Sequence, residues 1–169
     1  SAEFHEVLRQ NHITWEPTYS DASQQRGVAE RTIGIISQIA RVGLTWSRAP
    51  KPWWGEAILH ATVTRNMTPT TANRNTMCPF TAATGKDPEI RKLKPFGCLA
   101  FPNIPTMQMK GKLNHGARHA ILFGYGISPD GTLNGYRCYN LSTNRVTIKH
   151  DVTFNEDLPA MTHILTELV

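Results

Sequence analysis

The spacing of apolar and polar side chains divides the chain into a largely helical first part and a strand-rich second part. Apolar positions at helical spacing predict a helix over residues 2–11, and alternation from His12 to Glu16 predicts a short strand. The polar stretch 18–26 predicts a loop. From Gly27 a long helical pattern follows, and its apolar face comprises Val28, Ile35, Ile39, Val42 and Trp46.

Two further helices are indicated before the pattern changes. One, separated from the long helix by two prolines, runs from Trp53 to about Met67. Its apolar stripe comprises Trp54, Ile58 and Ala61. Of the two tryptophans at its start, one is expected in the core and the other at the surface. A short helix is expected over Pro79–Thr84, where Gly85 stops it.

Beyond residue 95 the chain changes to short β-rich runs punctuated by Gly and Asn. These runs are GCLAFPNI, HAILFGYG, GYRCYNL and RVTIKHDVTF. Their length and spacing are typical of a small antiparallel barrel. Residues 86–95 are charged and contain two prolines, so they form the expected boundary. The pattern as a whole predicts an α+β protein.

Charge favours a polyanionic partner. The chain has 169 residues, 18 lysines and arginines against 13 acids, and a net charge of +5. The excess lies in residues 51–115, which hold nine bases and three acids. The densest basic set comprises Lys86, Arg91, Lys92, Lys94, Lys110 and Lys112. This set fits a nucleic-acid surface, and a solvated loop explains it as well.

Other chemistries find little support in the sequence. The three cysteines, Cys78, Cys98 and Cys138, are far apart, which argues against a zinc knuckle or disulfide framework and favours a reducing compartment. His115 and His119 would share a helix face, but a metal site needs further ligands. No apolar run is long enough to span a membrane, and no hydrolase or nucleotide-binding motif is present. We therefore expect an intracellular protein, nuclear or cytoplasmic, with no membrane partner.

Several motifs in one register resemble the integrases of Copia-type retrotransposons. The resemblance covers roughly Ala2 to Glu156. It is carried by QQRGVAER, WGEAILHATVTRNMTPT, CPFTAATGKDP, LKPFGCLAF, AILFGYG and NGYRCYNLSTNRVTIKHDVTFNE. In the family the first of these is usually QQNGVAER-like, so Arg26 departs from the usual Asn.

This resemblance implies a fold and a division of the chain. Residues 1–85 would be the last part of a truncated ribonuclease-H-like integrase core, mostly helical with one short strand. Residues 86–95 would be a linker, 96–157 an SH3-like β-barrel, and 158–169 a tail. The family's core holds two Mg²⁺ ions with three carboxylates, and the last carboxylate corresponds to Glu30, as catalytic residue and metal ligand.

Glu30 alone does not make a catalytic site. Two-metal phosphoryl transfer needs carboxylates from several directions, because each Mg²⁺ takes near-octahedral oxygen ligands. The family's second Asp lies further from the Glu than the 29 residues that precede Glu30 here. Asp21 could approach Glu30 from the preceding loop, but an Asp there is more often a turn residue. We therefore expect Mg²⁺ binding to be ancestral, and no independent catalysis.

DNA is the expected partner, through Arg and Lys side chains that neutralise phosphates. The expected contacts are Arg26, Arg31, Arg41, Lys86, Lys92, Lys94, Lys110 and Lys112. Phe96 and Phe101 could stack on bases, although the barrel core is the favoured place for them. Three interpretations stay open: a fragment of an integrase, a module that binds DNA or a host protein, and a domesticated protein-interaction module with no nucleic-acid role. Helix faces left bare by a truncated core would suit a homodimer or a host protein.

Overall fold

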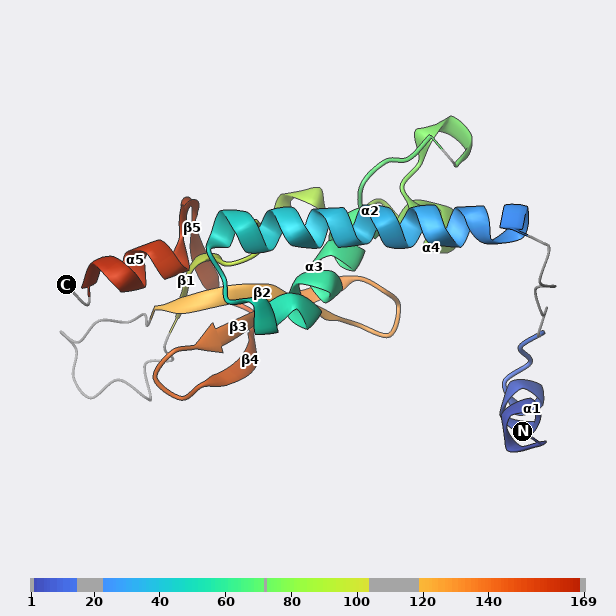
Figure 1. The fold of residues 1–169 in the computed structure, drawn as a ribbon, viewed down its shortest axis with the longest axis horizontal. Helices are drawn as coiled ribbons and strands as arrows, with labels where there is room; N and C mark the ends of the chain where they lie inside the picture. Colours follow the sequence, from blue (N-terminus) through green and yellow to red (C-terminus); the bar gives the residue numbers. More distant parts are fainter. Residues whose placement is uncertain (1, 15–22, 72, 104–118, 168–169) are drawn as a thin grey trace. The chain divides into compact units, whose positions relative to one another are not determined.

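A computed structural model describes residues 2–14, 23–71, 73–103 and 119–167 (Figure 1). The chain divides into two compact units, Ser1–Ile35 and Ile36–Val169. The boundary lies within one long helix, so each unit is considered by itself. Residues 86–95 belong to the second unit, and their expected role as a domain linker stays a prediction.

The first unit contains α1 (Ala2–Gln10) and the beginning of α2 (Ser23–Ser47). Helix α1 confirms the expected helix. The expected strand is wrong for residues 12–14, because the chain leaves α1 through a turn in which His12 has a φ of 53°. The rest of that strand, residues 15–16, lies outside the described residues. The expected loop is wrong for residues 23–26, which already form the first turn of α2.

The second unit contains the remaining helices before the sheet. These are η1 (Lys51–Trp53), α3 (Trp54–Asn66), η2 (Arg74–Thr76), α4 (Pro79–Thr84) and η3 (Ile90–Lys92). Helices α3 and α4 confirm the two helices expected in this region. Helix α4 begins where the Cys78 Sγ accepts a hydrogen bond from the Thr81 amide, and it ends at Gly85, whose φ is 70°. Glycine adopts this left-handed conformation without a Cβ clash, which explains the stop.

Five antiparallel strands and a last helix complete the second unit. They are β1 (Cys98–Pro102), β2 (Ala120–Ile127), β3 (Leu133–Asn140), β4 (Arg145–Lys149), β5 (Val152–Pro159) and α5 (Ala160–Glu167). The strand order is β4-β3-β2-β1-β5. All four expected β-rich runs therefore form strands, and the last splits in two. The described residues form no second sheet, and the ribonuclease-H-like core stays a prediction.

Helix α2 buries only part of its expected apolar face. Ile39 packs against the core, as do Ile36 and Leu44. Val28 and Val42 are 78% and 63% exposed, whereas the small residues Ala40 and Ser47 are 5% and 0% exposed. The expected face is therefore right for Ile39 and wrong for Val28 and Val42, and at Ser47 the helix packs closely against a backbone turn.

That turn is Phe96–Gly97, immediately before β1. Phe96 is 3% exposed, and a Cβ built on Gly43 of α2 would lie 3.2 Å from the Phe96 Cβ. Gly97 has a φ of 75°, and a Cβ there would lie 2.3 Å from the Ser47 Cβ. The Gly97 amide donates to the Leu122 carbonyl at 2.8 Å, and its carbonyl accepts from the Ala160 amide at 3.0 Å. The turn therefore joins α2 to the sheet.

Helix α3 lies against β2 (Figure 1). Ala57 and Ala61 are 1% and 0% exposed, which lets the helix approach the strand closely. Trp53 packs against Phe123 with ring centroids 4.7 Å apart, while Trp54 is 64% exposed. One tryptophan in the core and one at the surface is the expected outcome, but the expected apolar stripe of this helix is wrong for Trp54. Phe96 is also confirmed as a core residue.

Replacing Gly97 with Ala should destabilise the second unit by about 2–4 kcal/mol. The new Cβ would meet Ser47, and a non-glycine residue at positive φ carries its own cost. Urea unfolding measures the change. Gly55→Ala is the matched control, because a Cβ on Gly55 of α3 has no atom within 4 Å.

A second substitution separates the two causes. Ser47→Gly removes the clashing side chain, so the Gly97→Ala change should cost less free energy of unfolding in that background than alone. Equal costs in both backgrounds would show that the Ser47 side chain contributes nothing.

Candidate functional site

Glu30 lies on α2, well beyond its first turn. Because the helix begins at Ser23, Glu30 is its eighth residue. The helix dipole acts mainly on the first turn, so it does little to stabilise this carboxylate. Glu30 is exposed and has no hydrogen-bond or ion-pair partner among the described residues. Its assignment as a catalytic metal ligand stays a prediction.

The described residues do not fit a two-metal site. They contain no group of three or more His, Cys, Asp or Glu side chains that could hold a metal ion. Asp21, the acid that could approach Glu30, lies outside the described residues. One exposed carboxylate supplies too few oxygen ligands for Mg²⁺, and we derive no chemical step from it.

Among the expected DNA contacts whose side chains are described, only the arginines of α2 have no acidic partner in the described part of the chain. Arg31 and Arg41 are each exposed, and neither has a carboxylate partner in the described part of the chain. The backbone of Arg26 belongs to the first turn of α2, but its side chain is not described. A guanidinium without a carboxylate partner can offer all its N–H donors to phosphate.

The expected lysine contacts are paired with acids instead. Lys86 binds Asp130 at 2.8 Å, Lys92 binds Glu89 at 2.8 Å, and Lys94 binds Glu156 at 2.6 Å. Lys110 and Lys112 lie outside the described residues. The three described lysines therefore do not form a set of free charges. Surface ion pairs contribute only about 0–1 kcal/mol, so a phosphate could still displace these carboxylates.

Asp130 shows the effect of such pairing. The Lys86 ammonium, together with the hydroxyl and amide of Thr132, holds the pKa of the Asp130 carboxyl well below its usual range. The carboxylate therefore stays charged, and paired with Lys86, at neutral and mildly acidic pH.

A buried polar network lies directly beside the Phe96–Gly97 turn. The Lys94 carbonyl accepts from His60 Nε2 at 2.8 Å and from the Tyr125 hydroxyl at 3.0 Å. The Lys94 amide donates to the Tyr125 oxygen at 2.8 Å. Burial lowers the pKa of His60 and raises that of Tyr125, so both side chains are neutral near pH 7. The network ties α3 and β2 to the segment before β1.

The cysteines are structural. All three are buried and free. Burial raises the pKa of Cys98 and of Cys138 to about 12. Because the thiolate is the nucleophile and metal ligand, Cys98 and Cys138 are poor candidates for either role.

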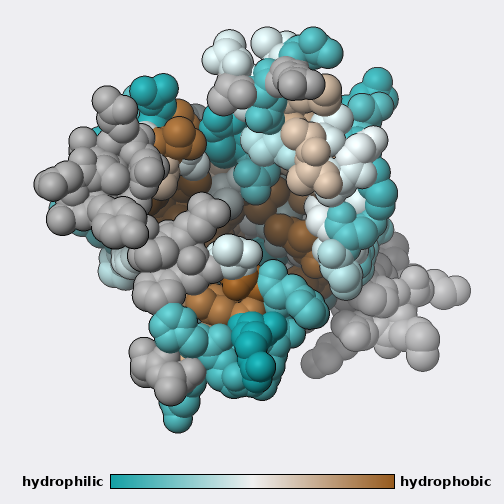
Figure 2. Space-filling model, turned by 90° about the vertical axis from the view of Figure 1, so that its right-hand side faces the viewer, coloured by the Kyte–Doolittle hydropathy of each residue, from teal (hydrophilic) through white to brown (hydrophobic). Residues whose placement is uncertain are grey.

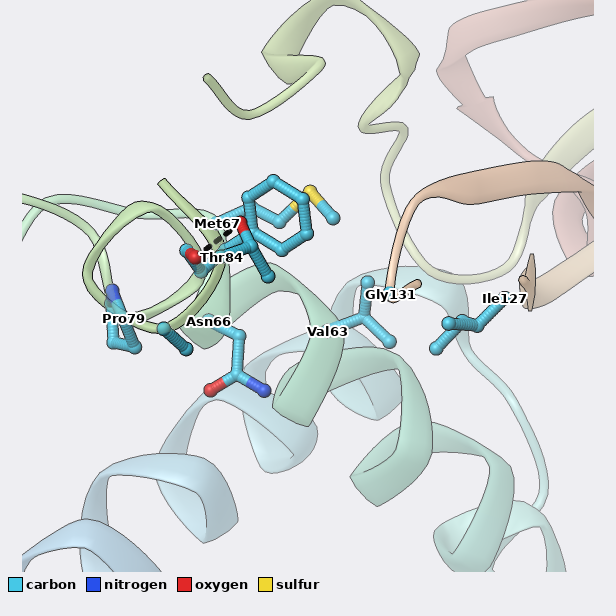
Figure 3. Close-up of a pocket in the computed structure, with 9 residues that line it drawn as sticks. Val63, Asn66, Met67, Pro79, Thr84, Ile127 and Gly131 are labelled. Atoms are coloured by element: carbon cyan, nitrogen blue, oxygen red, sulfur yellow. Dashed lines mark hydrogen bonds between the residues drawn. The ribbon is translucent and has the colours of Figure 1, made fainter. Parts of the chain in front are cut away.

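Two of the hollows between the helices and the sheet are lined by residues of β2. The first, of about 320 Å³, lies between α3, α4 and the turn after β2, and Val63, Met67 and Ile127 face it (Figure 3). Asn66 is its amide-bearing side chain. The second, of about 340 Å³, lies beside Ile148 of β4. Figure 2 shows apolar residues in a hollow of the surface with hydrophilic residues around it. None of the described helices is long and apolar enough to cross a membrane.

Comparison with known families identifies the strand-rich part. Residues 98–164 match the retroviral polymerase SH3-like domain. The described sheet, β1 to β5, lies within this match. No solved structure matches the chain.

The relatives cover nearly the whole chain. It is 33% identical over 156 residues to the retrovirus-related Pol polyprotein from transposon TNT 1-94 of Nicotiana tabacum, covering 92% of this chain and 11% of the relative. It is 27% identical to that from transposon RE1 of Arabidopsis thaliana, covering 94% of this chain and 10% of the relative. The RE2 polyprotein of the same plant is 26% identical, over 89% of this chain and 10% of the relative.

The fold and these matches define a Pol-derived segment with an SH3-like domain. The chain belongs to the Pol polyproteins of Copia-type retrotransposons, and it spans about a tenth of the length of the curated relatives it matches.

Lowering the pH should destabilise the second unit through His60. Its pKa in the folded protein lies below the ordinary value of 6.5, so the unfolded chain binds more protons between the two values. The free energy of unfolding should be highest above pH 6.5 and should fall as the pH drops towards the folded pKa. Urea unfolding from pH 8 to pH 5 measures this dependence.

The matched comparison is His60→Gln, which keeps an N–H donor for the Lys94 carbonyl but does not titrate. Below pH 6.5 the free energy of unfolding should fall less in this variant than in the wild type. An unchanged decline would show that His60 is not its source.

Proposed function

We propose that this chain is the DNA-binding part of a Copia-type integrase that contacts the phosphate backbone. The observation that carries the proposal is the pair of α2 arginines, Arg31 and Arg41, each exposed and without a carboxylate partner among the described residues. Membership in the Copia-type Pol family supports it, as does the net charge of +5. Such contacts neutralise phosphates and give salt-dependent affinity.

The lysines play a lesser part in this proposal. Lys86, Lys92 and Lys94 each have to leave a carboxylate before they can contact a phosphate. The two arginines need no such exchange. Arginine also forms two parallel hydrogen bonds to phosphate, which a lysine cannot do.

The catalytic history of the chain belongs to the same proposal. In this interpretation residues 1–85 derive from a ribonuclease-H-like core, and Glu30 is one of three carboxylates that held two Mg²⁺ ions. We expect no independent catalysis from this chain, and that expectation stays a prediction. A DNA-binding role places the protein in the nucleus, or in the cytoplasm before integration.

A second candidate is a domesticated protein-interaction module with no nucleic-acid role. The observation that favours it is the exposure of large apolar side chains on the helices of the second unit. Val42 is 63%, Trp54 64% and Leu59 56% exposed. Scattered apolar residues are normal on a surface, whereas a set of this size also suits a homodimer or a host protein.

Replacing Arg31 or Arg41 with Gln should weaken duplex DNA binding, because each variant has one cation fewer to neutralise a phosphate. The slope of log affinity against log salt should fall by about one for each arginine replaced. Fluorescence anisotropy with a labelled duplex, over a salt series, measures both. Arg9→Gln is the matched control, because Arg9 of α1 is already paired with Glu6 at 2.9 Å. Lys92→Gln should have a smaller effect than either arginine variant.

Two outcomes would count against the proposal. If Arg9→Gln weakens binding as much as Arg31→Gln and Arg41→Gln, the affinity reflects net charge alone. If no duplex binds even at low salt, the DNA role is wrong and the protein-interaction candidate is favoured.

A further inference from the structure

The sheet ends at β4, whose outer edge has no strand partner among the described residues. All five β4 residues pair with β3 in an uninterrupted register, from Arg145 opposite Asn140 to Lys149 opposite Tyr136. Four of the five are exposed, and Lys149 is half-buried. A regular, exposed edge offers a row of backbone N–H and C=O groups to another extended chain.

The two faces of β4 carry different chemistry. Side chains alternate along a strand, so Val146 and Ile148 share one face while Arg145, Thr147 and Lys149 share the other. In the β3 register Val146 lies opposite Tyr139, and Ile148 lies opposite Arg137.

The apolar face of β4 is on the side of the helices. Tyr139 contacts Trp53 with ring centroids 5.2 Å apart, and Arg137 binds Glu56 of α3 at 2.8 Å. Because cross-strand neighbours share a face of the sheet, Val146 and Ile148 face the same side as these contacts.

An apolar groove lies on this face beside Ile148. It has a volume of about 340 Å³ and runs between α3 and strands β2, β3 and β4. Three of the side chains that line it are strongly exposed: Leu59 by 56%, Ile127 by 55% and Ile148 by 53%. The groove could bury apolar side chains of a strand added to β4.

The other face of β4 is basic. Arg145 and Lys149 have no carboxylate partner in the described part of the chain. They are four residues apart and therefore lie on the same face of the strand. An added strand would place acidic side chains directly opposite both of them.

A second copy of this chain fits the edge poorly. Antiparallel pairing of two β4 strands about Thr147 would set Arg145 of one copy opposite Lys149 of the other, and like charges opposite each other are destabilising. The other edge of the sheet, β5, has a register break opposite Cys98 and Leu99 and ends at Pro159. Bulges and prolines block regular strand addition.

We propose that the β4 edge binds an extended peptide segment of another protein, in which acidic and apolar residues alternate. The peptide backbone pairs with β4, its apolar side chains enter the groove beside Ile148, and its acids pair with Arg145 and Lys149. Strand addition of this kind obtains affinity from main-chain hydrogen bonds and specificity from alternate side chains. This role is separate from DNA binding, and its residues do not include Arg31 or Arg41.

The test uses the full chain and a labelled synthetic nonapeptide in which Glu alternates with Val. Fluorescence anisotropy measures affinity, and a peptide in which Lys alternates with Val is the charge control. We expect Arg145→Glu and Lys149→Glu together to weaken binding about tenfold, and Ile148→Thr to weaken it about threefold. Arg91→Glu, a reversal at another exposed arginine, should change binding less than about twofold.

A backbone measurement shows whether the peptide adds a strand. Hydrogen exchange of β4 amides should slow when the Glu/Val peptide binds, in wild type and in Arg91→Glu. Circular dichroism of each variant confirms that weaker binding does not come from unfolding.

Three results would overturn the proposal. The first is equal binding of the Glu and Lys peptides, and the second is peptide binding without protection of β4 amides. The third is that the wild type binds no peptide while the Arg145→Glu/Lys149→Glu variant loses duplex DNA binding. That result would assign Arg145 and Lys149 to a phosphate-binding surface. Arg31→Gln and Arg41→Gln should leave peptide binding unchanged. A failure of the peptide proposal is therefore distinct from a failure of the proposed DNA role.

Discussion

The second unit depends on the close approach of α2 to the Phe96–Gly97 turn. Larger side chains at Gly43 or Ser47 would meet Phe96 or Gly97, so the contact depends on the small residues at these two positions. Gly97 contributes a backbone conformation, with φ at 75°, that other residues rarely adopt. Phe96, Gly97 and Cys98 therefore have separate structural roles. Phe96 fills the core, Gly97 allows the backbone to lie close to Ser47 of α2, and Cys98 is fully buried.

This contact determines how the helices and the sheet share one core. Phe96 lies in a cluster with Ala57 of α3, Leu99 of β1 and Ile121 of β2. The chain just before it is held by His60 and Tyr125 through the Lys94 main chain. Buried polar groups without partners are costly, so this network fixes one position of the segment. The residues matched to the SH3-like domain, 98–164, are thus packed against residues that precede the match.

Local signals predicted most of the elements. The caps of α4 at Cys78 and Gly85, and the alternating β-rich runs, depend on near neighbours in the sequence and could be found there. The start of α2 was missed because Gln and Arg in residues 23–26 are polar, yet they are good helix formers. The small buried residues of α2, Ala40 and Ser47, were missed because hydrophobicity favours large residues.

The candidate site was less predictable for a related reason. Lys86 and Lys94 pair with acids 44 and 62 residues away, and composition cannot show such partners. The buried His60 could have been suspected from its apolar neighbours Leu59 and Ala61, although nothing in the sequence pointed to the Lys94 carbonyl. Arg31 was identified from family register and Arg41 from its place on the same helix, and only the structure distinguishes them from the paired lysines.

Because α3 and the SH3-like sheet share one core, we expect them to open together as one cooperative unit. Native-state hydrogen exchange in increasing denaturant tests it most directly. We expect the amides of residues 57–61 in α3 and of residues 121–123 in β2 to converge to the same free energy of opening. If the α3 amides exchange through an opening of much lower free energy while β2 stays protected, the helix is only an accessory to the sheet and the shared core is contradicted.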